Sequence, residues 1–138
     1  MKHLKFVHLH IVAFLLISGL MLTSIGHAET AVIVHPSNNS SLSKKDIQRI
    51  FLGKLKTFPG GNDAIPIDLP ILSPIRHKIG KTVLKKSILQ VKSYWSRMVF
   101  TGRGIPPKEV DGPKEIKELV AVNPSVIGYI DDSMVDSS

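Results

Sequence analysis

Short runs of β-branched and apolar residues alternate along this chain with longer segments of helical periodicity. The runs are residues 31–35 (AVIVH), 64–69 (AIPIDL) and 126–130 (VIGYI), and turn-forming residues lie beside them. One helical segment separates the first run from the second, and three separate the second run from the third. Strands that alternate with helices are typical of α/β domains. We therefore predict an α/β domain with a small, mainly parallel sheet flanked by helices.

Local signals define the ends and faces of these helices. In the first segment Ser43 can cap the helix, and Gly53 is placed to end it in a left-handed conformation. In the second, four-residue spacing predicts one buried stripe (Ile75, Ile79 and Val83). In the third, five apolar residues fit the helical repeat without a miss (Val91, Tyr94, Trp95, Met98 and Val99). Pro66, inside the second run, indicates an edge strand or a strand start.

Residues 1–28 have the pattern of a secretory signal peptide. Lys2 and Lys5 give a basic start, residues 11–22 form an apolar run, and small residues precede residue 29. A membrane anchor is the alternative, but this run is shorter than the roughly 20 apolar residues that span a bilayer. We expect residues 29–138 to form one domain that is periplasmic or secreted and does not span the membrane once the signal is cleaved.

The composition of residues 29–138 excludes several kinds of site. They contain no cysteine, so neither a disulfide nor a thiolate metal site can form, and their only histidines are His35 and His77. We therefore predict no metal and no cofactor. No nucleophile elbow, dinucleotide-binding motif or P-loop is present. We predict that the protein is not an enzyme.

The same residues carry an excess of positive charge. Without the two lysines of the leader, 16 Lys and Arg stand against 11 Asp and Glu, a net charge of +5. A basic exported domain suits an anionic partner such as a small oxyanion, lipid headgroups or an acidic polymer, and nucleic acid is not expected in that compartment. The alternative is that the lysines only keep the domain soluble.

The stretch 69–80 (LPILSPIRHKIG) changes from apolar to cationic where the second helical segment begins. Ser73 is a good N-cap and Pro74 suits the first helical position. Three cationic or titratable side chains follow at once (Arg76, His77 and Lys78). A helix start after a strand offers free N–H groups and a positive dipole end to an anion. A capped helix whose cations face water has the same pattern, and both interpretations stay open.

A second candidate surface lies in residues 94–107 (YWSRMVFTGRGIPP). Trp95 falls in the apolar stripe of its helix and is expected in the core. Arg97 is on the last turns of that helix, and Arg103 lies between two glycines in the loop after it. Cations in such a loop are either solvated or kept for a partner. We expect residues 105–113 to form a loop.

Four motifs in this order resemble the phosphate-type substrate-binding proteins of ABC transporters: LSKKDIQRIFLGK, SPIRHKI, SYWSRMVFTGRGIPP and VNPSVIGYI. Members of that family are periplasmic and have two lobes. The resemblance extends over residues 31–130 and corresponds to one lobe. It implies a single lobe of a type 2 periplasmic-binding-protein-like fold, related to the substrate-binding component of phosphate ABC transporters.

The resemblance also implies a ligand site at the start of the second helical segment. In the family, a Ser-Gly-Thr at a helix start and an arginine shortly before it grip the phosphate. Ser73 matches the serine, whereas Pro74 and Ile75 stand at the glycine and the threonine. Leu69 stands at the arginine, so Arg76 is the nearest forked cation. The implied function is weak binding of phosphate or a related oxyanion at Ser73, Ile75 and Arg76.

The alternative is an interaction or sensor module that docks on a membrane permease or a sensor protein. Arg97, Arg103 and Lys78 would then meet an acidic surface of that partner. A single open lobe buries less of a small ion than a closed two-lobed site does. A partner would therefore also strengthen ion binding if it supplied the other wall.

Overall fold

The computed structural model describes residues 29–135, which fold around one hydrophobic core. The predicted leader, residues 1–28, lies outside the described residues. The elements follow in the order β1 (Thr30–Val34), α2 (Lys44–Phe51), β2 (Ile65–Asp68), α3 (Pro74–Ile79), α4 (Ile88–Phe100), β3 (Lys108–Glu109), α5 (Pro113–Val122) and β4 (Val126–Asp131). A π-helical turn, η1 (Gly80–Leu84), continues α3, and a 3₁₀ turn, η2 (Asp132–Met134), follows β4.

The strands form one sheet in the order β1-β4-β2-β3. β2 is parallel to both of its neighbours, pairing Pro66 with Ile127 of β4 and Asp68 with Glu109 of β3. β1 is antiparallel to β4. Two of the three strand pairs are parallel, so the prediction of a mainly parallel sheet is confirmed. Pro66 is the second residue of an inner strand. It therefore marks a strand start, and the edge alternative is wrong.

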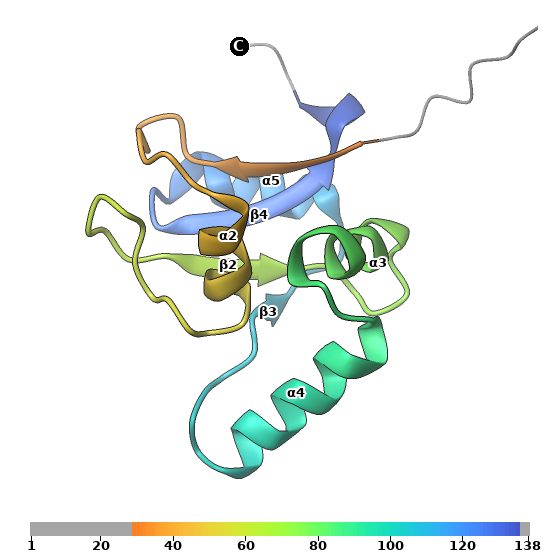
Figure 1. The fold of residues 1–138 in the computed structure, drawn as a ribbon. Helices are drawn as coiled ribbons and strands as arrows, with labels where there is room; N and C mark the ends of the chain where they lie inside the picture. The colour runs from red at the N-terminus through yellow and green to blue at the C-terminus, as the bar shows by residue number, and fades with distance from the viewer. Residues whose placement is uncertain (1–28, 136–138) are drawn as a thin grey trace, which may run out of the picture.

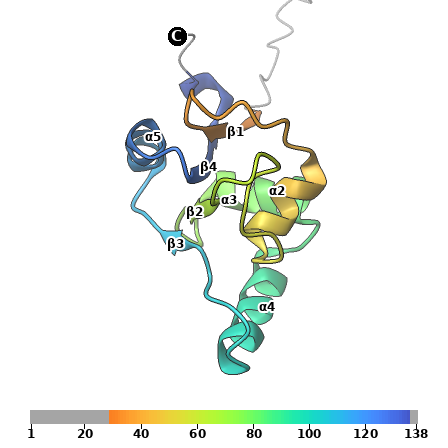
Figure 2. The same ribbon diagram turned by 90° about the vertical axis from the view of Figure 1, so that its left-hand side faces the viewer.

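Helices cover both faces of this sheet (Figure 1, Figure 2). α5 packs on β4 and β1 from one side, whereas α2 and α3 lie on the other. Gly128 of β4 permits the close approach of α5, because a Cβ at this position would lie 2.3 Å from Cγ2 of Ile116. Ile116 and Ile127 are both fully buried. The sheet is therefore the middle layer of three.

The start and end of α2 follow the sequence signals. Ser43 and Asp46 form a capping box, in which each side chain accepts a hydrogen bond from the backbone of the other residue. Gly53 has the predicted left-handed conformation, with φ at 67°. The buried face of α2 carries Ile47 and Ile50.

The second helical segment changes half-way along. α3 is regular only to Ile79, and the π-helix η1 then continues to Leu84. The Lys86 N–H donates to the Gly80 carbonyl (2.9 Å), and Lys85 takes a left-handed conformation with φ at 54°. The predicted stripe still packs on the core (Ile75, Ile79 and Val83).

The prediction of a loop over residues 105–113 is wrong at Lys108 and Glu109, which form β3. These two residues are held by backbone pairing with β2, and the next N–H, of Val110, donates to the Asp68 carbonyl (3.0 Å). Two charged residues give no β-branched or apolar run from which a strand could be predicted. β3 is a strand only because it pairs with β2.

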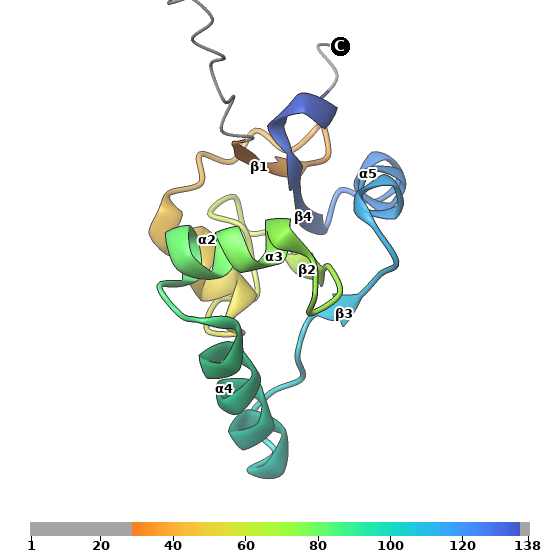
Figure 3. The ribbon, with the colours of Figure 1, turned by 90° about the vertical axis from the view of Figure 1, so that its right-hand side faces the viewer.

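α4 extends away from the sheet and the other helices (Figure 3). Trp95 is buried, as predicted, and anchors α4. Its ring lies so close to two glycines that a Cβ on Gly53 would be 2.9 Å away and one on Gly104 3.3 Å away. Tyr94 Oη donates to the Leu52 carbonyl (2.6 Å). No helix within residues 29–135 is long and apolar enough to cross a membrane.

Candidate functional site

Ser73 begins α3 directly after the carboxyl end of β2. Its Oγ accepts a hydrogen bond from the Arg76 backbone N–H (3.4 Å), so the hydroxyl caps the helix. Pro74, at the first helical position, has no N–H to offer a ligand. Ile75 packs against the core. The structure thus brings Ser73 and Arg76 together, and the contact between them is a helix cap.

The Arg76 guanidinium is bound by two carboxylates. Nη2 lies 2.9 Å from Oδ2 of Asp68, and Nη1 lies 2.5 Å from Oε1 of Glu109. Nη1 also donates to the Leu69 carbonyl (2.7 Å). The Arg76 side chain is only 13% exposed. One cation between two carboxylates leaves an excess of negative charge, which does not attract an anion.

Asp68 is the centre of a cluster that we call the Asp68 brace (Asp68, Leu69, Arg76, Glu109 and Tyr129). Tyr129 Oη and the Leu69 N–H (2.9 Å) both donate to Oδ1 of Asp68. Burial raises the pKa of Asp68, against the hydrogen bond from Tyr129 and the charge of Arg76. Burial, together with the charge of Asp68, also raises the pKa of Tyr129. The phenol therefore keeps its proton and remains a donor.

The sequence reasoning identified Arg76 and missed its partners. The parallel pairing of β2 with β3 sets Asp68 beside Glu109, and this pairing depends on a strand with no local signal. Two carboxylates side by side repel each other, and Arg76 between them relieves that repulsion. Binding of an anion at Ser73, Ile75 and Arg76 therefore stays a prediction. It would require a guanidinium that is already paired with two carboxylates.

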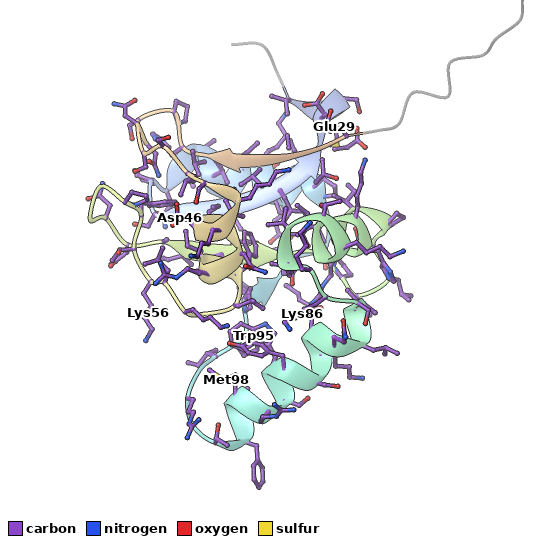
Figure 4. All side chains as sticks on the ribbon, viewed as in Figure 1. Glu29, Asp46, Lys56, Lys86, Trp95 and Met98 are labelled. Atoms are coloured by element: carbon purple, nitrogen blue, oxygen red, sulfur yellow. The ribbon has the colours of Figure 1, made fainter. Side chains whose placement is uncertain are left out.

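A second candidate region consists of α4 and the loop to β3, and we call residues 88–107 the α4 ridge. Four of its apolar side chains are exposed to solvent: Phe100 is 92% exposed, Ile105 88%, Leu89 69% and Val99 54%. The opposite face of α4 is packed, with Trp95 and Met98 turned toward the body of the protein (Figure 4). The ridge therefore has an anchored side and an open side.

Two grooves border the α4 ridge. The first, of about 1050 Å³, lies between the ridge and the start of β2, with Trp95, Val99 and Ile65 in its wall. The second, of about 620 Å³, lies between the ridge and the loop before α3, with Val99, Phe100 and Ile71 in its wall. Both walls are mainly apolar. Exposed apolar surface on this scale is typical of an interaction site.

Positive charge surrounds these grooves. Residues 69–108 contain nine Lys or Arg and no Asp or Glu. The cations on the ridge or in the groove walls, apart from Arg76, are Lys56, Lys92, Arg97, Arg103 and Lys108. One acid lies in each wall: Asp63 in the first and Glu109, already paired with Arg76, in the second. The open side of the ridge is thus apolar with a cationic rim.

Of the three predicted partner-contact residues, the structure brings two together. Arg97 and Arg103 both belong to the α4 ridge and are exposed. Lys78 lies on α3, and its charge contributes, after the hydrogen bonds from Ser133, to a lowered pKa of Asp131. Lys78 therefore belongs to a different surface. Within residues 29–135 there is no group of three His, Cys, Asp or Glu that could hold a metal ion.

Comparison with known proteins identifies the fold. No protein-family model and no curated protein matches the chain. Among solved structures, a Clostridium perfringens protein described as a phosphate ABC transporter substrate-binding protein, with bound phosphate, matches with a TM-score of 0.61 and 22% identity. The match covers 78% of this chain and 41% of that one. An ABC-type phosphate transport receptor from Vibrio cholerae matches with a TM-score of 0.49 and 15% identity, over 78% of this chain and 42% of that one.

The chain thus spans about two fifths of the length of the solved structures it matches. At 22% identity, the likeness to the C. perfringens structure establishes the fold alone. The order of strands and helices predicted from the sequence leads to the same architecture. The chain has the α/β fold of a single lobe of a type 2 periplasmic binding protein.

Proposed function

We propose that this chain is an exported lobe of the solute-binding type that works by docking on a second protein through the α4 ridge. The observation that carries this proposal is the open side of the ridge, where Val99, Phe100 and Ile105 face solvent beside two apolar grooves. Full burial of a side chain of this kind contributes roughly 1.5–3 kcal/mol. The three together are enough to anchor an interface.

The chemistry of the ridge is that of an interface centre with a charged rim. Aromatic residues, Met and Arg are enriched where proteins meet, and binding energy concentrates on a few of them. The ridge supplies Phe100 beside two exposed arginines, Arg97 and Arg103. Since those arginines have no carboxylate partner in the described part of the chain, an acidic partner surface would complete them.

The charge also selects the kind of partner. A second copy of this chain would bring one cationic ridge against another, and like charges across an interface cost several kcal/mol. A permease or sensor protein with an acidic, partly apolar face outside the cytoplasmic membrane fits better. Export rests on the signal-peptide pattern of residues 1–28.

Site-specific photo-crosslinking in cells that naturally produce the protein tests this proposal. A photoreactive amino acid replaces Phe100 in one variant and Val122 in the control, because both side chains are exposed and apolar and Val122 is on α5. We expect one adduct of defined mass from position 100 and none from position 122. Charge reversal by Arg97→Glu and Arg103→Glu should remove the adduct, since the acidic rim of the partner would then be repelled.

Three outcomes would contradict the proposal. Equal adducts from positions 100 and 122 would indicate random collisions. An adduct with the mass of two copies of this chain would make the occupant a second copy. An adduct that survives both charge reversals would exclude an acidic partner surface.

A second candidate function is weak binding of phosphate or a related oxyanion at Ser73, Ile75 and Arg76. The position of Ser73 favours it, because the helix start lies beyond the carboxyl end of an inner strand, where open α/β sheets hold their ligands. The ion pairs of Arg76 with Asp68 and Glu109 oppose it. Neither candidate function involves catalysis, a metal or a cofactor.

Calorimetric titration with phosphate separates the two candidates. If the oxyanion site exists, Glu109→Gln should tighten binding, because it removes one of the two negative charges that are paired with Arg76, and Ser73→Ala should weaken it. Sulfate and a carboxylate serve as comparison ligands. Absence of heat at millimolar phosphate in both the natural protein and Glu109→Gln would remove the oxyanion function and leave docking untouched.

A further inference from the structure

We propose a further binding site, separate from the α4 ridge and from the Asp68 brace, in a cationic pocket between α2 and the end of η1. We call it the η1 pocket. Its volume is about 380 Å³, and five cations line it (Lys45, Arg49, Lys54, Lys85 and Lys86). No acidic residue is in its wall. The ligand we assign to it is a small anion that carries two or more phosphate groups.

One face of α2 forms the first wall of the pocket. Lys45, Gln48 and Arg49 recur at the spacing of a single helix face, while Ile47 and Ile50 are buried on the other face. Gln48 Nε2 donates to the Leu84 carbonyl (3.0 Å) and ties this wall to η1. The cations are therefore held around one cavity by two connected elements.

The acid nearest to these cations in the sequence, Asp46, forms no ion pair with them. Hydrogen bonds from Ser43 lower the pKa of this acid, and the charges of Arg49 and Lys45 contribute to the lowering. Asp46 is the only acidic residue of α2. Its Oδ2 accepts hydrogen bonds from Ser43 Oγ (2.6 Å) and the Ser43 N–H (3.1 Å) in the capping box. Figure 4 shows Asp46 at the start of α2, with Lys86 away from it beyond the end of η1. None of the five cations forms an ion pair with a carboxylate of residues 29–135.

The backbone at Lys85 supplies an independent observation. Lys85 is the only residue other than glycine with positive φ within residues 29–135. This conformation costs an L-residue roughly 1–2 kcal/mol, and glycine is the usual choice at such a helix end. A π-helix immediately before it is also uncommon and is frequent at functional sites. A lysine that is kept in a strained conformation at the wall of a cationic pocket indicates that its charge serves to bind an anion.

The number and arrangement of the cations define the ligand. One oxyanion offers a single centre of charge, whereas five cations around a cavity within the roughly 300–1,000 Å³ of small-molecule sites match several. Clustered phosphate oxygens accept the charge-assisted hydrogen bonds that Lys and Arg donate. A soluble polyphosphate and a phosphate-bearing lipid headgroup share this chemistry.

Calorimetric titration of the protein with tripolyphosphate tests the site. Lys85→Gly removes one charge and relieves the backbone strain, so the variant folds while its affinity should fall about tenfold, the loss expected for one charge-assisted contact. Adding Arg49→Gln should weaken binding further. Lys114→Ala is the matched control, because it removes the same charge from an exposed position on α5, outside both the pocket and the α4 ridge.

A second arm distinguishes the source of the phosphate groups. Vesicles of phosphatidylcholine with phosphatidic acid are sedimented with the same variants. Binding of tripolyphosphate or of these vesicles that Lys85→Gly weakens and Lys114→Ala preserves supports the site and names its ligand. Equal losses of affinity in Lys85→Gly and Lys114→Ala would mean that only the net charge of the protein matters and would contradict the site. No binding in either arm would overturn the proposal. Both arms are independent of docking through the α4 ridge.

Discussion

The Asp68 brace and the α4 ridge are neighbouring regions that differ in whether their side chains have partners within the protein. In the brace, each charged group meets a partner inside the protein, so that Arg76 lies between Asp68 and Glu109. In the ridge, the side chains of Phe100 and Ile105 are exposed to solvent, among cations that form no ion pair with a carboxylate of residues 29–135. The charges of the brace are thus paired within the protein, whereas the side chains of the ridge are exposed to solvent.

The difference separates stability from binding. A matched buried cluster fixes the junction of β2, β3 and α3, and has little left to offer a ligand. An unmatched surface adds little to the stability of the chain and keeps its interaction energy for a partner. The cationic stretch 69–108 contributes to both regions. Only the structure shows which of its cations are paired with a carboxylate, as Arg76 is.

The largest effect is expected from breaking the brace. Asp68→Ala leaves Arg76 partly buried with one partner fewer and deprives Tyr129 of its acceptor, so the free energy of unfolding should fall by about 3–5 kcal/mol. Urea denaturation measures this loss. Lys114→Ala is the control, since its pair with Glu118 is exposed and should change stability by no more than about 0.5 kcal/mol. Similar losses of unfolding free energy in both variants would mean that the contacts of Asp68 contribute no more than an exposed ion pair.

The packing of α5 on the sheet tests whether the buried part of the protein is as tightly packed as the comparison requires. Gly128→Ala places a methyl group against Ile116 in a fully buried contact, and the overpacking should cost about 1–3 kcal/mol. Thermal unfolding followed by circular dichroism checks this. Gly112→Ala, which adds its methyl group in open space, should have a distinctly smaller effect. A neutral Gly128→Ala would show that α5 can move away from β4.

The pH dependence of stability gives a smaller signal from the same brace. Because burial raises the pKa of Asp68 above its ordinary value of 3.8, the folded protein holds this proton more tightly than the unfolded chain. The resulting stabilisation is complete below 3.8 and is lost as the pH rises through the raised pKa.

Urea denaturation at a series of pH values from about 4 to about 7 measures this trend. The free energy of unfolding of the natural protein should decrease with pH relative to that of Asp68→Asn. Asp46 and Asp131, whose pKa values are lowered by hydrogen bonds from Ser43 and Ser133, act in the opposite direction, and their stabilisation is lost only as the pH falls. An unchanged difference between the two proteins over this range would contradict the direction for Asp68.

The smallest effect on stability is expected at the ridge. The double variant Val99→Ser, Phe100→Ser removes one side chain that is half exposed and one that is 92% exposed, so the free energy of unfolding should fall by less than about 1 kcal/mol. Docking should nevertheless be lost, and a photo-crosslinker placed at Ile105 measures this. A large loss of stability would show that these side chains belong to the core after all.

Local sequence signals predicted the regular parts of this structure well. The caps at Ser43 and Ser73 and the left-handed Gly53 depend on residues close in the chain, and the structure has each of them. The α/β class follows from the alternation of strands and helices, and it is confirmed. Short-range patterns are sufficient for such features because the interactions that create them are themselves short-range.

The features that decide the site depend on contacts between distant segments. No local pattern indicates β3, and without β3 the approach of Glu109 to Asp68 cannot be foreseen. The fate of Arg76 follows from that approach, so the sequence alone could not tell a free guanidinium from a matched one. The anion site at Ser73, Ile75 and Arg76 stays a prediction for this reason.

The position of Trp95 makes α4 observable by itself. The chain has one tryptophan, and its ring is seated between Gly53 and Gly104, where α4 joins the rest of the protein. Intrinsic fluorescence is therefore a reporter of that joint, whereas circular dichroism averages over all helices and strands. Release of α4 before global unfolding would separate the two denaturation curves, and a partner seated in the first groove would shift the emission without any added label.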